Sequence, residues 1–100
     1  MPYSYGESSV EATASWYESG ELTANGEAFN PDANTCASNS YKFGTILKVT
    51  NLANGRSVYC RVNDTGGFHK YGRAFDLSRK TFSDIADLDK GLIQVRIEAK

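Results

Sequence analysis

Apolar and polar positions alternate along several short stretches of the chain, a pattern typical of β-strands with one buried face. In residues 10–17 the alternation places Ala12, Ala14 and Trp16 on one face and polar side chains on the other. In residues 45–64 two apolar-rich runs flank the turn sequence Ala53-Asn54-Gly55. The sequence therefore predicts a first strand and, further along, a two-stranded hairpin.

In the last third of the chain, the spacing of the apolar residues changes twice. Arg73–Leu77 predicts a short strand, and Ser78 is suited to cap a following helix. Apolar residues then recur at helical spacing from Phe82 to Leu88, so we expect one short amphipathic helix that ends at Gly91. Alternation returns in Ile93–Ile97 and predicts the final strand.

In two stretches the apolar residues recur at neither strand nor helix spacing. Asn30–Ser40 is rich in Asn, Asp, Ser and Ala and contains Pro31, so it predicts a loop with one helical turn around Thr35–Asn39. Upstream, Asn25-Gly26 is a strong turn signal, and it presents Glu27 on a tight loop.

Five or more short strands with one helix in a domain of 100 residues indicate a small closed or nearly closed β-barrel. A hydrophobic content of 40% and a net charge of -1 are those of a folded globular domain. The 11 Lys and Arg are matched by 12 Asp and Glu, so a nucleic acid gripped through its phosphates is not expected as a partner. No apolar run is long enough to cross a bilayer. The protein is expected to be a monomer.

The two cysteines, Cys36 and Cys60, lack the Cys-x-x-Cys spacing of a redox or zinc pair. They are either two separate buried thiols or one disulfide formed in an oxidising compartment. No cluster has metal-ligand spacing, so neither a metal nor a cofactor is expected. The polar residues 1–9 lack a secretory signal pattern, which indicates a cytoplasmic protein or one whose signal peptide has been removed.

The segment 61–78 carries the candidate chemistry. An alternating strand arrives at Asp64, and Gly66-Gly67 then turns the backbone. Asp76 lies between two apolar residues, as if it faced the interior or a cleft. Charged side chains are rarely enclosed without a partner or a task, so both aspartates are candidate site residues.

Eight short motifs stand in the order and spacing of the rare lipoprotein A family. They are Ala14-Ser15-Trp16-Tyr17, Thr23-Ala24-Asn25-Gly26-Glu27, Phe43-Gly44-Thr45, Val49-Thr50-Asn51-Leu52, Asn54-Gly55-Arg56-Ser57, Arg61-Val62-Asn63-Asp64, Asp76-Leu77-Ser78-Arg79 and Val95-Arg96-Ile97-Glu98. The chain resembles the family's barrel domain over residues 12–100, after a lead-in of residues 1–11. More distantly, it is similar to the barrels of expansins, lytic transglycosylase A and barwin-type proteins.

The resemblance implies a mainly β fold, a six-stranded double-psi β-barrel with one or two short helices. It also implies a secreted, periplasmic or cell-envelope protein, made with a signal peptide, that acts on peptidoglycan or a related polysaccharide. The family's activity is that of a lytic transglycosylase. Such an enzyme cleaves the bond between N-acetylmuramic acid and N-acetylglucosamine and leaves a 1,6-anhydro end.

Carried over by position, the resemblance assigns the family's Glu to Glu27 and its Asp to Asp64, and Asp76 matches the Asp of expansins and lytic transglycosylase A. The candidates for substrate binding are Tyr17, Ser38, Asn63, Phe68 and Arg73. Each carboxylate has a structural alternative. Glu27 could be a solvated turn residue, Asp64 could cap the turn that follows it, and Asp76 could hold a loop or pair with an arginine.

The chain departs from the family at one position that concerns chemistry. Where the family usually has Thr-Ala-Ala-His, this chain has Thr35-Cys36-Ala37-Ser38, so Ser38 replaces the His. This departure favours an alternative function, a non-catalytic polysaccharide-binding module like expansins and barwin. A third alternative is a protein-binding barrel such as a secreted protease inhibitor. His69 lies outside the motifs and is expected to be a loop residue.

Overall fold

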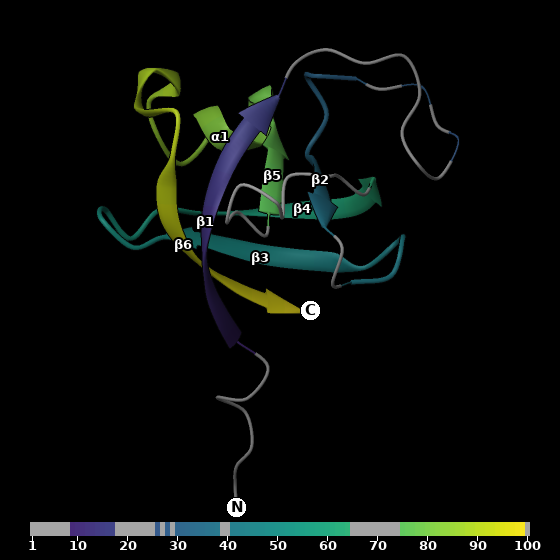
Figure 1. The fold of residues 1–100 in the computed structure, drawn as a ribbon, viewed down its shortest axis with the longest axis horizontal. Coiled ribbons are helices and arrows are strands. Elements are labelled where there is room, and N and C mark those ends of the chain that lie inside the picture. The colour runs from purple at the N-terminus through teal and green to yellow at the C-terminus, as the bar shows by residue number, and fades with distance from the viewer. Residues whose placement is uncertain are drawn as a thin grey trace, which may run out of the picture.

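The computed structural model describes residues 9–17, 26, 28, 30–38, 41–64 and 75–99, in which six strands close into a barrel (Figure 1). The strands are β1 (Ser9–Tyr17), β2 (Thr35–Ser38), β3 (Ile46–Asn51), β4 (Ser57–Asp64), β5 (Phe75–Ser78) and β6 (Ile93–Ala99). Their order around the barrel is β1-β5-β2-β4-β3-β6, and β6 pairs with β1 to close it. The helix α1 (Arg79–Ser83) and the 3-10 helix η3 (Leu88–Lys90) lie between β5 and β6.

The barrel combines two kinds of strand pairing. β1 pairs with β5, and β2 with β4, in parallel, whereas the remaining neighbours are antiparallel. Parallel strands cannot be joined by a tight turn, so the chain has to cross the barrel between them. The mainly β, six-stranded barrel expected from the sequence is confirmed, as are its first strand, its β3–β4 hairpin and its last strand.

The core lies inside the barrel and is built from the inward face of every strand. Its fully buried side chains include Ala14, Cys36, Leu47, Val49, Val62, Phe75, Leu77 and Val95. Trp16 packs against this core beside Phe82, and its indole N–H donates to the carbonyl of Leu88 at 3.1 Å. The face assigned to β1 from alternation alone is therefore the buried one.

β2 corrects the expectation of a loop with a helical turn at Thr35–Asn39. Residues 35–38 form a strand that is buried along its whole length, with β5 on one edge and β4 on the other. Four residues are too few to display a period. Pairing on both edges, together with burial, outweighs the weak β propensity of Ala and Ser, so local sequence could not reveal this strand.

The single helix expected between Ser78 and Gly91 is also corrected. Ser78 does cap α1, since its hydroxyl accepts from the Thr81 amide, but α1 ends at Ser83. The chain then continues irregularly to η3, while Ile85 remains fully buried. The side-chain amides of Asn51 and Asn54 both donate to the carbonyl of Ile85, at 2.8 and 3.0 Å, and satisfy a backbone group that a longer helix would have bonded internally.

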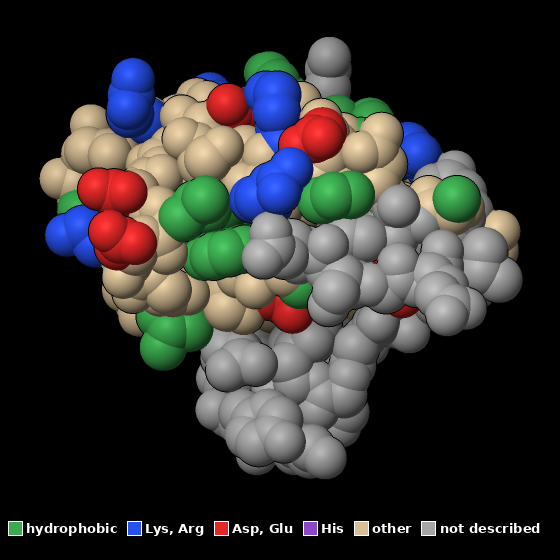
Figure 2. Space-filling view, turned by 90° about the horizontal axis from the view of Figure 1, so that it is seen from above, with side chains coloured by type: hydrophobic (Ala, Val, Ile, Leu, Met, Phe, Trp, Pro, Cys, Tyr) green, Lys and Arg blue, Asp and Glu red, His purple; other side chains and the backbone are tan. Residues whose placement is uncertain are grey.

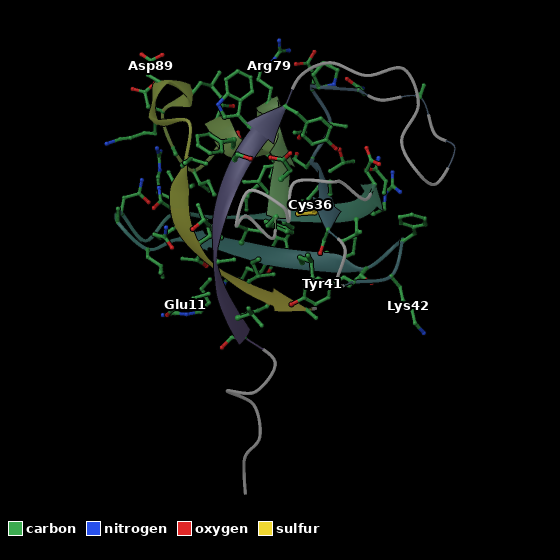
Figure 3. All side chains as sticks on the ribbon, viewed as in Figure 1. Glu11, Cys36, Tyr41, Lys42, Arg79 and Asp89 are labelled. Atoms are coloured by element: carbon green, nitrogen blue, oxygen red, sulfur yellow. A yellow bond between two sulfur atoms is a disulfide. The ribbon has the colours of Figure 1, made fainter. Side chains whose placement is uncertain are left out.

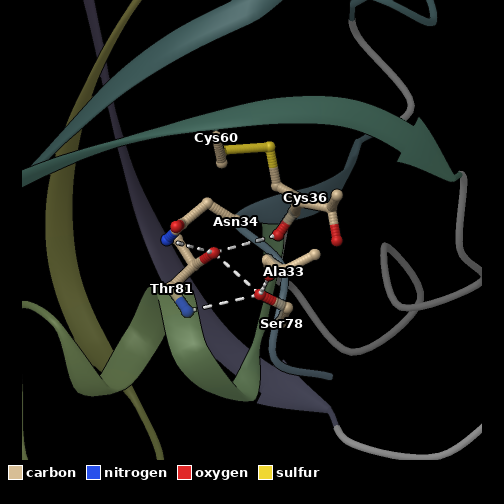
Figure 4. The surroundings of a disulfide bond; sticks show 7 residues. Ala33, Asn34, Cys36, Cys60, Ser78 and Thr81 are labelled. Atoms are coloured by element: carbon tan, nitrogen blue, oxygen red, sulfur yellow. Dashed lines mark hydrogen bonds between the residues drawn. A yellow bond between two sulfur atoms is a disulfide. The ribbon is translucent and has the colours of Figure 1, made fainter. Parts of the chain in front are cut away.

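Cys36 and Cys60 form a disulfide that links β2 to β4, with a Cα–Cα distance of 5.8 Å (Figure 4). This settles the alternative that the sequence left open. On the α1 side of β2, the hydroxyl of Ser78 donates to the carbonyl of Ala33 at 2.6 Å and lies 2.7 Å from that of Thr81. The hydroxyl of Thr81 also lies 3.4 Å from the carbonyl oxygen of Thr35, to which it donates, so β2 is held covalently to β4 and by a hydrogen bond to α1.

Candidate functional site

Four residues from four strands form one row across the sheet. Ser15 on β1 is paired with Asp76 on β5, Asp76 with Ala37 on β2, and Ala37 with Asp64 on β4. Residues directly opposite each other in a sheet point to the same face. The neighbours of this row in sequence, such as Leu77 and Cys36, belong to the core, so the row occupies the opposite face.

A shift in strand register brings Asp64 into this row. Cys36 is paired with Val62, but the next residue, Ala37, is paired with Asp64, so the register passes over Asn63. Alternation from Val62, which points into the core, would otherwise have turned Asp64 inward as well. Extra residues of this kind commonly re-aim a side chain next to an active site. The shift therefore places both aspartates on one face.

The two aspartates are separated by β2. Because neighbouring strands lie about 4.8 Å apart, their Cα atoms are about 10 Å from each other. Both side chains are half-buried. The hydroxyl of Ser15 donates a short hydrogen bond to Oδ1 of Asp76. In Figure 3, Cys36 marks the middle of the barrel, and Glu11, Lys42 and Asp89 lie on its periphery.

Tyr17 lies on the same face, two residues beyond Ser15 on β1. Its hydroxyl oxygen is buried. Burial raises the pKa of the Tyr17 phenol well above its ordinary value, and the negative charges of Asp64 and Asp76 raise it further. The phenol consequently keeps its proton at neutral pH and can act only as an uncharged hydrogen-bonding group beside the two carboxylates.

Of the other predicted site residues, the structure describes only Ser38 and Asn63. Ser38 is 1% exposed and Asn63 is 3% exposed, so neither side chain is presented at the surface. Ser38 follows Ala37 and shares the core-facing side of Cys36. Glu27, Phe68, Arg73 and His69 lie outside the described residues.

Sequence reasoning did not single out Ser15 as a site residue. The signal was present in the motif Ala14-Ser15-Trp16-Tyr17, where Ser15 shares the polar face with Tyr17. Its partner Asp76, however, is distant in the chain, and only the pairing of β1 with β5 shows that the two side chains meet.

Surface charge is mixed on the face seen in Figure 2, where Lys and Arg side chains lie among Asp and Glu. In the described part of the chain, no three His, Cys, Asp or Glu side chains are grouped so that they could hold a metal ion. None of the helices among the described residues has the length and apolar character needed to cross a membrane.

The family model described as lytic transglycolase, a double-psi β-barrel domain, matches residues 9–97. A probable endolytic peptidoglycan transglycosylase RlpA from Nostoc sp. is 44% identical over 95 residues, which cover 90% of this chain and 25% of that protein. The endolytic peptidoglycan transglycosylase RlpA of Campylobacter jejuni is 44% identical over 92 residues, which cover 89% of this chain and 33% of that protein. The chain thus spans about a quarter to a third of the length of these curated relatives.

Solved structures share the fold at lower sequence identity. The Streptomyces papain inhibitor superposes with a TM-score of 0.76 at 19% identity, covering 91% of this chain and 93% of the inhibitor. A mutant Clavibacter michiganensis expansin in complex with cellohexaose superposes with a TM-score of 0.72 at 21% identity, covering 92% of this chain and 50% of the expansin. These two structures establish the architecture, and their different names show that one barrel hosts several functions.

Proposed function

Because the chain belongs to the lytic transglycolase family, we propose that it cleaves the glycan strands of peptidoglycan between N-acetylmuramic acid and N-acetylglucosamine. The observation that carries this proposal is the register shift at Asn63, which brings Asp64 onto the same face as Asp76. A protein that acts in this way works in the bacterial cell envelope, outside the cytoplasmic membrane.

The reaction needs one carboxyl group that acts first as an acid and then as a base. We assign this role to Asp64. Its carboxyl donates a proton to the glycosidic oxygen as the bond from that oxygen to the anomeric carbon breaks. The resulting carboxylate then takes the proton from the C6 hydroxyl of the muramic acid while that oxygen closes on the anomeric carbon. The product is a 1,6-anhydro end, and no water is consumed.

Asp76 has a different role in this proposal. Its carboxylate is engaged by the hydroxyl of Ser15, which fixes its orientation, and it stabilises positive charge that develops on the sugar ring. The protonated phenol of Tyr17 lies in the field of both carboxylates and supplies a polar contact that carries no charge of its own. Glu27, which matches the family's Glu, is assigned as a supporting carboxylate from the sequence alone.

A second candidate function is polysaccharide binding without cleavage. It is favoured by Ser38, which stands where the family usually has a His and whose side chain is buried. No imidazole is therefore supplied from β2, and a barrel with this face intact could hold a glycan without breaking it.

The deciding experiment is mass spectrometry of soluble products after the protein is incubated with purified peptidoglycan, both intact and stripped of its stem peptides. We expect anhydro-muramyl fragments from the wild-type protein and none from Asp64→Asn. If the wild-type protein sediments with the insoluble glycan but releases no products, the binding function is correct and the enzymatic one is wrong.

A further inference from the structure

Two aromatic side chains on the β3–β4 hairpin are exposed to solvent. Phe43, just before β3, is 46% exposed, and Tyr59 on β4 is 50% exposed. Leu47, Val49 and Val62 of the same hairpin are fully buried in the core, whereas the two rings remain outside it. Exposed aromatic rings close to a candidate active site are candidates for ligand contact.

Strand alternation aligns Tyr59 with the candidate site. Cys60 and Val62 point into the core, so Tyr59 and Arg61 point away from it on the same face of β4. The register shift turns Asp64 to that face as well. At about 3.3 Å per residue, Tyr59 and Asp64 are about 16 Å apart along the strand.

Phe43 lies near the Asp64 end of the same strand. The amide of Gly44 donates to the carbonyl of Val62 at 2.8 Å, and the amide of Val62 donates to the carbonyl of Thr45 at 2.9 Å. Gly44 and Thr45, which precede β3, therefore bond to a single residue of β4, as in a β-bulge, and Gly44 has the positive φ of 91° that such a bend favours. This bend sets Phe43 beside the last residues of β4.

We propose that Phe43, Arg61 and Tyr59 form a glycan subsite that extends from Asp64 along the outer face of the hairpin. This inference rests on the proposed function, because it takes the occupant to be the continuation of the same polysaccharide strand. The C–H groups on one face of a pyranose ring are attracted to the negatively charged face of an aromatic ring. A guanidinium has five N–H donors and can bond carboxylate or hydroxyl oxygens of sugars held between the two rings.

The subsite makes a prediction about substrate length. A short oligosaccharide bound at Asp64 reaches Phe43 but not Tyr59, whereas a long strand reaches both. Tyr59→Ala should therefore raise the KM for long, peptide-free glycan strands about tenfold and leave kcat unchanged. It should leave the kinetics on a tetrasaccharide from the same glycan as they are. Phe43→Ala should raise the KM for both substrates, and Tyr59→Trp should retain the wild-type KM.

The matched control is Leu92→Ala. Leu92 is 52% exposed and lies beside β6 in a different part of the barrel, where it lines a cavity of about 410 Å³ together with Asn51 and Asn54. This substitution removes a similar exposed apolar side chain and should leave both KM values unchanged. If Tyr59→Ala behaves like Leu92→Ala on long strands, the subsite is wrong although the proposed function stands.

The same variants test the subsite if the wild-type protein binds the glycan without cleaving it. The measured quantity is then the affinity for long strands, which Tyr59→Ala should weaken about tenfold relative to Leu92→Ala. If the wild-type protein neither cleaves nor binds peptidoglycan, the proposed function fails and the subsite fails with it.

Discussion

The two halves of the barrel are built differently. β1, β6 and β3 pair in antiparallel register without a break, and opposite charges such as Lys48 and Glu98 are paired directly across them on the outer face. Around β2, the pairing with β4 is parallel, the register shifts by one residue, and a disulfide joins the two strands. The regular half forms the scaffold of the barrel. The two candidate carboxylates, Asp64 on β4 and Asp76 on β5, lie in the half where regular pairing is interrupted, and β1 of the regular half contributes Ser15 and Tyr17 beside them.

The largest expected effect is on the rate of glycan cleavage, which a substitution in one half should lower and a substitution in the other should not. Asp64→Asn should lower the rate of glycan cleavage by at least about 10³-fold, because it removes the proton that the reaction transfers. Its free energy of unfolding should change by less than about 1 kcal/mol, since no core contact is lost. The measurements are product release and chemical unfolding. Glu98→Gln on β6 is the control, and it should keep full activity.

A large loss of stability in Asp64→Asn would instead make this aspartate a structural cap of the turn that follows β4. That result would favour the structural alternative recognised in the sequence.

The next prediction compares two variants, one in each half, that should lose similar amounts of stability but differ in activity. Replacing Cys36 and Cys60 together by Ala should lower the free energy of unfolding by about 3 kcal/mol, because the disulfide restricts the unfolded chain. Leu47→Ala in β3 should cost about as much through the cavity that it leaves. Only the cysteine variant should also lose cleavage activity at a temperature where both variants are folded, since β2 and its register with Asp64 are held by the bridge.

Equal specific activity in the two folded variants would contradict a positioning role for the disulfide. The fraction folded is measured by circular dichroism in the same buffer as the assay.

A smaller effect is expected at Tyr17. Tyr17→Phe should lower the cleavage rate about tenfold by removing the phenol hydroxyl beside the two carboxylates. The raised pKa of this phenol has a second consequence. The folded state disfavours its ionisation, so its contribution to stability is complete below the unfolded-state pKa of about 10 and is lost as the pH rises through the folded-state pKa.

Unfolding measured between about pH 8 and about pH 11 should therefore show a shallower alkaline loss of stability in Tyr17→Phe than in the wild type. Tyr59→Phe, at an exposed tyrosine of β4, is the control for removing a phenol hydroxyl from the surface of the barrel.

The smallest effect concerns the contact that ties α1 to the segment before β2. The side chains of Lys80 and Asn34 both donate to Oδ2 of Asp84, at 2.7 and 3.2 Å, and the Lys80 bond is the main cause of the lowered pKa of Asp84. A lowered pKa stabilises the fold above the unfolded-state value of about 3.9, and this contribution is lost as the pH falls further. The group is exposed and solvent screens it, so Asp84→Asn should cost about 0.3 kcal/mol at neutral pH.

This cost should disappear when unfolding is measured at acid pH. Asp89→Asn, on η3, is the control for removing a negative charge from the same surface.

Alternation predicted the regular half of the barrel well, because β1, β3 and β6 are long enough to show a period of two. It also predicted that β4 ends at Asp64. It could not predict β2, whose four residues are positioned by both neighbours, or the register shift, which depends on how two distant strands meet. The pairing of Ser15 with Asp76 could not be predicted for the same reason, because it joins two strands that are distant in the chain. Local sequence identified the candidate carboxylates, and long-range pairing decides which face they share.

β1 and β6 come from distant parts of this sequence, and they are paired from Ser9 with Glu98 to Ala14 with Ile93. Contacts between residues so far apart in the chain form slowly, because the intervening loop must be closed before they become favourable. During synthesis, β1 has no partner on β6 until the last residues of the barrel have been made. The barrel is therefore expected to close in one late step, and β1 exposes an unpaired edge until that step occurs.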